Sequence, residues 1–329
     1  MYSAYTMKKY TVVVLIAIIL LSKSTFSQTV DKLFINDVSI ETSISGKLFG
    51  TLTLPENTTK KTPIALIIAG SGPTDRDGNN SMMKNNSLKL LAEQLALSGI
   101  GSVRYDKRGV AASISAARSE SELRFENYIN DAKDWINWIK SNHPHSKIIV
   151  IGHSEGSLIG MIAAAENANA FISIAGAGRA ADVILKEQLE SQPKLIKDMC
   201  FEMLDSLKIG KTKDSINPIL FSLFRPSVQP YLISWFKYDP QIQIKALNKR
   251  SLIIQGNNDI QTTIEDANLL HHANPSSKLI IIDKMNHLFK LVDGDRKTNV
   301  DTYNNPNIPI SPFLIESIVK FITSKDVMH

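Results

Sequence analysis

Residues 147–158 read Lys147-Ile148-Ile149-Val150-Ile151-Gly152-His153-Ser154-Glu155-Gly156-Ser157-Leu158. The apolar run at 147–151 predicts a buried β-strand, and the pattern from Ser154 to Ala165 predicts a helix that follows it directly. So sharp a corner holds its serine in a strained backbone conformation, and glycines two residues to either side let neighbouring chain approach without a Cβ clash. The stretch therefore predicts a strand–turn–helix unit with Ser154 at the corner.

Apolar runs alternate with helical patterns along most of the chain. Such alternation indicates βαβ units and a parallel sheet that is buried on both faces. Residues 32–54 instead read as an antiparallel hairpin with Gly46 in its turn. We expect an α/β fold with a mostly parallel twisted sheet, flanking helices and an N-terminal antiparallel hairpin. The buried-strand candidates are 64–69, 101–105, 147–151, 170–174, 251–255 and 278–282, and the helix candidates are 87–98, 122–140, 154–165, 264–273 and 313–323.

Residues 179–249 interrupt the alternation. They combine helical patterning with many aromatic residues but contain no strand candidate. We interpret the segment as a helical cap, or lid, inserted after the sixth strand, with apolar surface that could close over a cavity. A core position for each aromatic residue taken separately is the more frequent outcome. The core domain is then formed by 28–178 and 250–329.

The N-terminus predicts export. Lys8 and Lys9 precede an apolar run at 11–21 and small polar residues that extend to Ser27. This is the composition of a secretory signal peptide over residues 1–27, and the run is shorter than the roughly 20 apolar residues of a membrane-spanning helix. Cleavage before Gln28 predicts a periplasmic or secreted protein without stable membrane insertion. The alternatives are an uncleaved N-terminal anchor and a start at Met7.

Charge and cysteine content restrict the class of protein. Three lysines and no acid lie in the predicted signal peptide, so most of the net charge of +5 belongs to that segment. The remaining chain shows no clustered basic run, and a nucleic-acid partner is not indicated. Cys200 is the only cysteine, which excludes an intrachain disulfide. The sequence leaves the oligomeric state, including a homo-oligomer, open.

A base and an acid can be assigned to Ser154. A serine hydroxyl needs a base to take its proton, and histidine is the usual one. Of the seven histidines, only His287 lies in a loop just after the last strand candidate. Asp259 follows the strand candidate before it, and we predict that it orients His287; Asp283 is the competitor, nearer in sequence. The structural alternatives are a helix-capping Ser154, a surface His287 and a loop-capping Asp259.

Two backbone N–H groups are candidates for binding an oxyanion. The N–H of Glu155 lies at the positive end of the helix that begins after Ser154. Ser71 lies in the small-residue loop Ala69-Gly70-Ser71-Gly72-Pro73, and its N–H is the second candidate, with Gly72 as the alternative and a plain glycine-rich turn as the structural reading.

No metal or organic cofactor is indicated. The pair His143 and His145 has no cysteine or carboxylate ligands nearby in the sequence. Residues 176–181 fit the dinucleotide pattern G-x-G-x-x-A, but no second strand with a ribose-binding acid follows them.

With these residues in view, the chain resembles the α/β-hydrolase superfamily, in particular esterases related to serine aminopeptidases and prolyl oligopeptidase-like hydrolases. Its further markers are the segments 50–55, 69–79 and 104–109, and the order Ser154, Asp259, His287 is the one that this fold uses. The resemblance implies a serine hydrolase, specifically a carboxylesterase that cleaves small short-chain acyl esters through an acyl-enzyme. The alternatives are a serine peptidase, aminopeptidase or thioesterase with the same triad, and a non-catalytic binding protein on the same fold.

The resemblance also implies a charged network near the mouth of the cavity, for which a structural role is favoured. Its members would be Asp75, Arg76, Asp77, Asp106 and Arg108. The chain departs from the family pattern at residues 110–113, Val-Ala-Ala-Ser, where a further glycine is expected.

Overall fold

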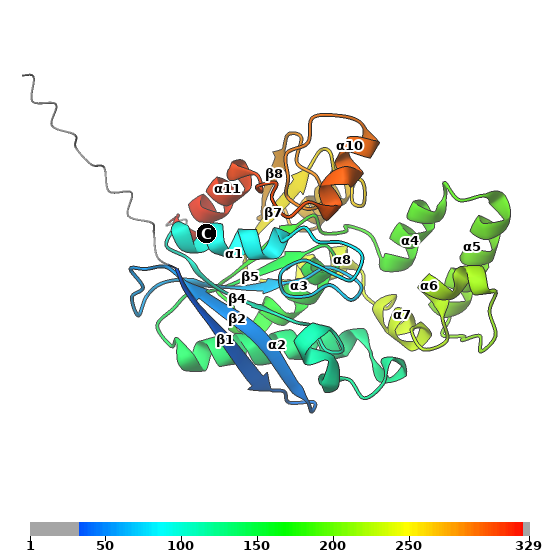
Figure 1. Ribbon diagram of the computed structural model, residues 1–329, viewed down its shortest axis with the longest axis horizontal. Helices are drawn as coiled ribbons and strands as arrows, with labels where there is room; N and C mark the ends of the chain where they lie inside the picture. Colours follow the sequence, from blue (N-terminus) through cyan, green and yellow to red (C-terminus); the bar gives the residue numbers. More distant parts are fainter. Residues whose placement is uncertain (1–32, 325–329) are drawn as a thin grey trace, which may run out of the picture. The chain divides into compact units, whose positions relative to one another are not determined.

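A computed structural model describes residues 33–324, so the predicted signal peptide lies outside the described residues. The described chain forms a sheet of order β1-β2-β4-β3-β5-β6-β7-β8 (Figure 1). β2 pairs antiparallel with β1 and β4, and the other neighbouring pairs are parallel. The expected hairpin and mostly parallel sheet are confirmed. The strands are β1 (Phe34–Glu41), β2 (Lys47–Leu54), β3 (Ile64–Ile68), β4 (Gly101–Tyr105), β5 (Ile148–His153), β6 (Ala170–Ile174), β7 (Arg250–Gly256) and β8 (Lys278–Ile282).

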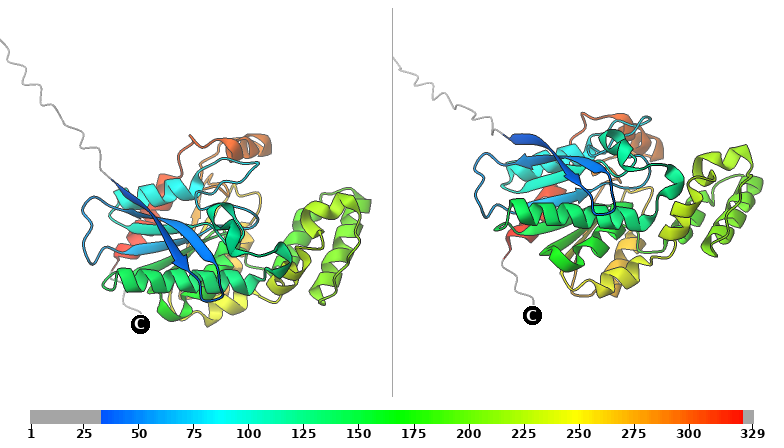
Figure 2. Two further views of the ribbon diagram at one scale, coloured as in Figure 1. Left: turned by 60° about the horizontal axis from the view of Figure 1, so that its bottom comes forward. Right: turned by 90° about the horizontal axis from the view of Figure 1, so that it is seen from below.

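Helices cover both faces of the sheet (Figure 2). Successive side chains of a strand point to opposite faces of the sheet. All side chains of β3 are apolar because both faces of this strand are buried. Ile64 and Leu66 pack on one face, while Ala65 and Ile67 pack on the other. The first face is covered by α2 (Phe125–Asn142), α3 (Glu155–Asn167), α8 (Pro240–Ala246) and α9 (Ile264–Ala273), and the second by α1 (Ser87–Leu97) and α11 (Pro312–Thr323).

β8 corrects one expectation. The sequence predicts that residues 278–282 are buried on both faces, but Lys278 and Ile281 are exposed and only Ile282 is buried. β8 is the last strand in the sheet order and pairs only with β7. An edge strand is covered less completely than a central one, and its apolar composition alone does not reveal that position.

The chain between β6 and β7 forms the expected helical insertion. It contains α4 (Ala181–Leu189), α5 (Lys194–Lys208), α6 (Phe221–Phe224), α7 (Gln229–Trp235) and α8. Helices α4 to α7, in green and yellow-green, stand apart from the sheet in Figure 1 and share an apolar cluster that includes Leu204, Phe224 and Phe236. Ile244 of α8 instead packs in the main core. The part with a core of its own is therefore narrower than 179–249, and its role as a lid stays a prediction.

The remaining described elements are short. They are the 3₁₀ segments Ala111–Ala116, Glu120–Glu122, Pro218–Leu220 and Thr302–Asn304, and the helix α10 (Arg296–Asp301). Within residues 33–324, no helix combines the length and the apolar character needed to cross a membrane.

Candidate active site

Ser154 occupies a strained corner between β5 and α3. Its backbone has φ 54° and ψ −121°, a conformation that residues with a Cβ rarely adopt. Such strain costs on the order of 1–3 kcal/mol and persists only where the surrounding structure imposes it. Ser154 stands at the N-cap position of α3, but its side chain makes no capping hydrogen bond. The helix-capping alternative for this serine is therefore not what the structure shows.

Gly152 and Gly156 permit this corner because backbone passes directly beside them. A Cβ on Gly152 would lie 2.2 Å from the Gly156 carbonyl oxygen, and a Cβ on Gly156 would lie 2.4 Å from the Ile68 carbonyl oxygen. Both separations are far below a van der Waals contact. The glycine spacing around Ser154 is thus required by the packing of α3 onto the ends of β5 and β3.

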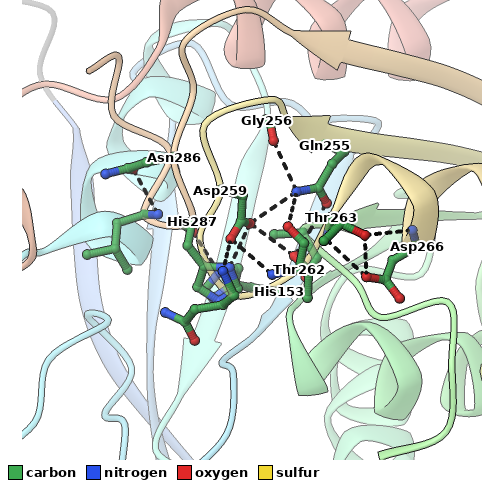
Figure 3. A network of polar contacts seen from close by, with 12 residues as sticks. His153, Gln255, Gly256, Asp259, Thr262, Thr263, Asp266, Asn286 and His287 are labelled. Atoms are coloured by element: carbon green, nitrogen blue, oxygen red, sulfur yellow. Dashed lines mark hydrogen bonds and ion pairs between the residues drawn. The ribbon is translucent and has the colours of Figure 1, made fainter. Parts of the chain in front are cut away.

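His287 and Asp259 form a hydrogen-bonded pair in the loops that follow β8 and β7 (Figure 3). The distance from His287 Nδ1 to Asp259 Oδ2 is 2.8 Å, and the two side chains are only 4% and 1% exposed. The other carboxylate oxygen, Oδ1, accepts from the backbone N–H groups of Gln261 and Thr262. Asp259 therefore caps its own loop with one oxygen and holds His287 with the other.

The environment of Asp259 favours its ionised form. Burial alone would raise the pKa of Asp259, but the charge and hydrogen bond of His287, together with the two backbone N–H groups, outweigh it and lower that pKa. Gln255 and Thr262 also donate side-chain hydrogen bonds to Oδ2. An ionised carboxylate with this many donors is fixed in position, which is what an orienting acid requires.

The competing acid, Asp283, has a different partner. Its exposed side chain accepts a hydrogen bond of 2.7 Å from Asn257 Nδ2. The structure therefore pairs His287 with Asp259.

His153 lies directly against His287. The ring centroids are 4.7 Å apart, and His153 Nε2 lies 3.0 Å from the His287 carbonyl oxygen. Burial, followed by the proximity of His287, lowers the pKa of His153 to about 3. His153 is consequently neutral near pH 7. Because it immediately precedes Ser154, it connects the serine corner to the backbone of the His287 loop.

Ser154 faces a cavity of about 340 Å³. Ser71, Gly72 and Glu155 line it as well, and the backbone N–H groups of Ser71 and Glu155 have no hydrogen-bond partner within residues 33–324. Both predicted donors thus lie beside Ser154 with their N–H groups unused. Much of the wall is apolar and comes from α3 and the inserted helices, including Leu158, Ile184, Leu185, Leu223, Leu232 and Trp235.

His287 does not line this cavity. Two chains of contacts connect it to the cavity wall. Thr262, which lines the cavity, donates to Asp259 at 3.0 Å, and Asp259 binds His287. His153, the neighbour of Ser154, contacts the His287 carbonyl oxygen. Among the described residues, neither Ser154 Oγ nor His287 Nε2 makes a hydrogen bond. Catalytic hydrogen bonds are commonly long in unliganded sites and tighten when substrate binds.

The charged residues around the loop after β3 make structural pairs. Arg76 binds Asp106 through two side-chain nitrogens, Arg104 binds Asp77 and Arg108 binds Asp131. Asp75 accepts from the backbone N–H groups of residues 77 and 79. None of the five predicted network residues lines the 340 Å³ cavity, which agrees with the structural role that was favoured.

The departure at residues 110–113 has a backbone explanation. Ala111 adopts φ 45°, in the left-handed region that glycine occupies most easily. A glycine was expected there, and alanine takes up the same conformation with some strain.

Within residues 33–324, no group of three or more His, Cys, Asp or Glu side chains is arranged to hold a metal ion. The glycine pattern at 176–181 serves the protein itself, since the Gly178 N–H and the Arg179 side chain both bind Asp266.

Sequence reasoning missed a buried polar cluster at the wall of the cavity. The Glu155 carboxylate accepts from Tyr231 Oη at 2.8 Å and lies 3.7 Å from Lys107 Nζ. Lys107 belongs to the segment 104–109 that carries the resemblance, but its partners come from distant parts of the chain. No local pattern indicates them.

A strained serine corner at the end of a central parallel strand, with an Asp–His pair in the loops after β7 and β8, defines the α/β-hydrolase fold. Residues 84–280 match the family described as "Serine aminopeptidase, S33". The match spans more than half of the chain, and the chain belongs to this family.

Several of the similar proteins are named as esterases. The esterase EstD of Thermotoga maritima is 27% identical over 259 residues, which cover 77% of this chain and 60% of EstD, so the chain spans only about 60% of that relative's length. Est1E of Butyrivibrio proteoclasticus, solved with ferulic acid, superposes with a TM-score of 0.59 at 17% identity, over 87% of this chain and 100% of that one. The Pyrococcus furiosus esterase Pf2001 gives 0.53 at 15%, over 88% and 92%. The two structures show the fold alone.

Proposed function

We propose that this chain is a serine hydrolase that cleaves carboxylic esters through an acyl-enzyme. Ser154 Oγ attacks the ester carbonyl, His287 takes the proton and returns it to the leaving alcohol, and Asp259 orients the imidazole. The N–H groups of Ser71 and Glu155 bind the oxyanion. A water molecule then attacks the acyl-enzyme. His287 takes its proton and returns it to Ser154 Oγ as the carboxylic acid leaves. The observation that carries the proposal is the buried 2.8 Å pair of His287 and Asp259, at the same edge of the sheet as the strained Ser154.

The charges of the cavity wall favour a neutral substrate. Arg179 is paired with Asp266, and Arg225 is paired with Glu120. Among residues 33–324, Glu155 is the only carboxylate that lines the cavity, and it already contacts Tyr231 and Lys107. An aminopeptidase needs acids that face the substrate amine, so the wall supports an ester with a short apolar acyl group over a peptide with a free N-terminus. A thioester would fit the same wall.

The direct test compares ester hydrolysis by the wild type and by Ser154→Ala. We expect p-nitrophenyl butyrate to be hydrolysed by the wild type and kcat/KM to fall at least about a thousandfold in the variant. Ser157→Ala, one turn further along α3, removes a buried hydroxyl that bonds Ser173 and should keep most of the activity. Full activity in Ser154→Ala would exclude this mechanism.

The substrate class has its own test. Esters should be cleaved at least about tenfold faster, as kcat/KM, than aminoacyl p-nitroanilides, because no free acid in the wall meets a substrate amine. Butyryl thioesters measured beside them decide between esterase and thioesterase. Faster cleavage of the anilides would assign a peptidase instead.

We further propose that the protein is exported and acts in the periplasm or outside the cell. The basic and apolar composition of residues 1–27 supports this. Terminal sequencing of the protein recovered from a secretion-competent host should begin at Gln28. Recovery of the full-length chain in the membrane fraction would favour an uncleaved anchor.

A further inference from the structure

Lys107 is a buried lysine that lines a hollow of about 150 Å³ beside the 340 Å³ cavity, and Glu155 and Tyr231 line both. It follows β4 in the chain, and it is only 1% exposed. Its Nζ donates a hydrogen bond of 2.5 Å to the carbonyl oxygen of Gly70. Gly70 immediately precedes Ser71 in the loop after β3. A lysine is rarely buried so completely without a specific partner, and here the shortest contact is to a main-chain carbonyl.

The geometry of the peptide bond gives this contact its meaning. The carbonyl of Gly70 and the N–H of Ser71 belong to one planar trans peptide unit, so they point in opposite directions. Because Lys107 binds the Gly70 carbonyl oxygen, the Ser71 N–H points to the side of the peptide away from the ammonium group. Ser71 lines the cavity together with Ser154, whereas Gly70 does not. Because the ammonium group binds the carbonyl oxygen, it also polarises the peptide and makes the Ser71 N–H a stronger hydrogen-bond donor.

The surroundings of Lys107 include one buried carboxylate and connect it to the inserted helices. The Glu155 carboxylate of α3 lies 3.7 Å from Nζ, and the Tyr128 ring of α2 lies 5.3 Å from it. Glu155 in turn accepts from Tyr231 of α7. Burial lowers the pKa of Lys107, and the charge of Glu155 opposes that effect. Arg108, Glu120 and Arg225 line the same hollow as Lys107. Arg108 is paired with Asp131, Arg225 is paired with Glu120, and the nearby His153 is neutral.

We propose that Lys107 is a positioning residue of the oxyanion site. Its ammonium group fixes and polarises the Gly70–Ser71 peptide, so that the Ser71 N–H rather than the Gly72 N–H receives the negative oxygen. The inference rests on the proposed hydrolase function and deepens it. Lys107 does not line the cavity that Ser154 faces, and it acts through the peptide that it binds.

The first experiment uses Lys107→Met, which keeps the length of the side chain and removes its charge and donors. An oxyanion donor acts in the transition state, so kcat should fall by about tenfold or more while KM for p-nitrophenyl butyrate changes little. Phenylboronic acid forms a tetrahedral adduct with an active serine, and its inhibition constant should weaken by a similar factor. A matched control is Arg250→Met, since Arg250 also donates to a main-chain carbonyl, that of Phe321 at 3.0 Å, but at the opposite end of β7 from the site.

The outcomes distinguish the role of Lys107 from the hydrolase function on which that role rests. Wild-type kcat and boronate inhibition in Lys107→Met would overturn the role of Lys107, and so would an equal loss in Arg250→Met or a loss of kcat with unchanged boronate inhibition. Wild-type activity in Ser154→Ala would instead remove the hydrolase function, and the inference with it. A lower kcat and weaker boronate inhibition in Lys107→Met, with KM unchanged, support the proposal.

A second experiment leaves Lys107 in place in case the first variant does not fold. Glu155→Gln keeps the acceptor for Tyr231 but removes the charge that supports protonation of Lys107. The alkaline limb of kcat should then move to lower pH by about one unit, since an opposite charge at this distance has an effect of that size. An alkaline limb at the wild-type position would overturn the proposal.

Discussion

Asp259 divides its two carboxylate oxygens between its own loop and His287, which makes it the residue whose replacement is easiest to interpret. Asp259→Asn keeps the shape but removes the charge and favours the wrong tautomer of His287. We expect kcat/KM to fall by at least about a hundredfold. Asp283→Asn is the control, because Asp283 is exposed and bonds Asn257. Equal losses in the two variants would show that the assignment of the acid is wrong.

Gly156 tests how strictly the packing requires the serine corner. A Cβ there would meet main-chain oxygens of Ile68 and Ala69 at 2.4 and 2.6 Å, which cannot move aside. We expect Gly156→Ala to lower the free energy of unfolding by about 3 kcal/mol or more. In Gly160→Ala the closest contacts are side chains at 3.0 and 3.2 Å, and alanine is the better helix former, so the change should be much smaller. Denaturant unfolding of both variants measures the difference, and similar values would refute the steric account.

The buried neutral His153 makes stability depend on pH. Its pKa is about 3 in the folded protein, lowered from 6.5, so the unfolded chain binds a proton in this range that the folded one does not. Stability from His153 is therefore complete above about pH 6.5 and decreases toward pH 3, by at most about 1.4 kcal/mol per pH unit. Burial raises the pKa of Asp131 to about 6, which has the opposite sign, so the wild type alone does not isolate His153.

The difference between the wild type and His153→Gln isolates it, because Asp131 is present in both and glutamine retains a donor for the His287 carbonyl. The unfolding free energy of the wild type should fall more steeply than that of the variant from pH 6.5 downward. Parallel curves would mean that His153 is not held neutral by burial.

Sequence reasoning reached the three triad candidates because each follows a recognisable strand: Ser154 after β5, Asp259 after β7 and His287 after β8. It did not reach Lys107 or the contacts of His153. Those contacts form between segments that are distant in the chain. The sequence around a lysine or histidine does not show whether its side chain is exposed or buried.

At the scale of elements, the inserted helices supply part of the wall of the 340 Å³ cavity, and in the proposed mechanism they determine how much room an acyl group has. Leu185 of α4 lines the cavity, and a larger side chain at that position would fill part of the 340 Å³. We expect Leu185→Trp to retain activity on p-nitrophenyl acetate and to lose at least about tenfold on the octanoate, relative to the wild type. A chain-length profile of kcat/KM measures this. An unchanged profile would place the acyl group elsewhere.

The strands and long helices were predicted closely because each carries a clear period or a continuous apolar run. β8 differed in burial because its apolar residues do not encode an edge position, where one face is covered only in part. The insertion was recognised from the missing strand. The attachment of α8 to the core was not, since Ile244 is apolar in either setting and only its packing distinguishes them.

For the molecule as a whole, topology explains why residues 154, 259 and 287 can serve one site. Parallel strands end at the same edge of a sheet, and β5, β6, β7 and β8 are consecutive in the sheet order. The family match over 84–280 includes Ser154 and Asp259 but ends before His287. The position of His287 therefore rests on the sheet topology and on its contact with Asp259.

The most direct test of the central claim is labelling of the native protein with a fluorophosphonate, followed by mass mapping of the modified peptide. The account predicts one label, on Ser154, that is absent from Ser154→Ala and from heat-denatured protein, and greatly slowed in Asp259→Asn. Absence of labelling in the native wild type, or a label on another serine, would contradict it.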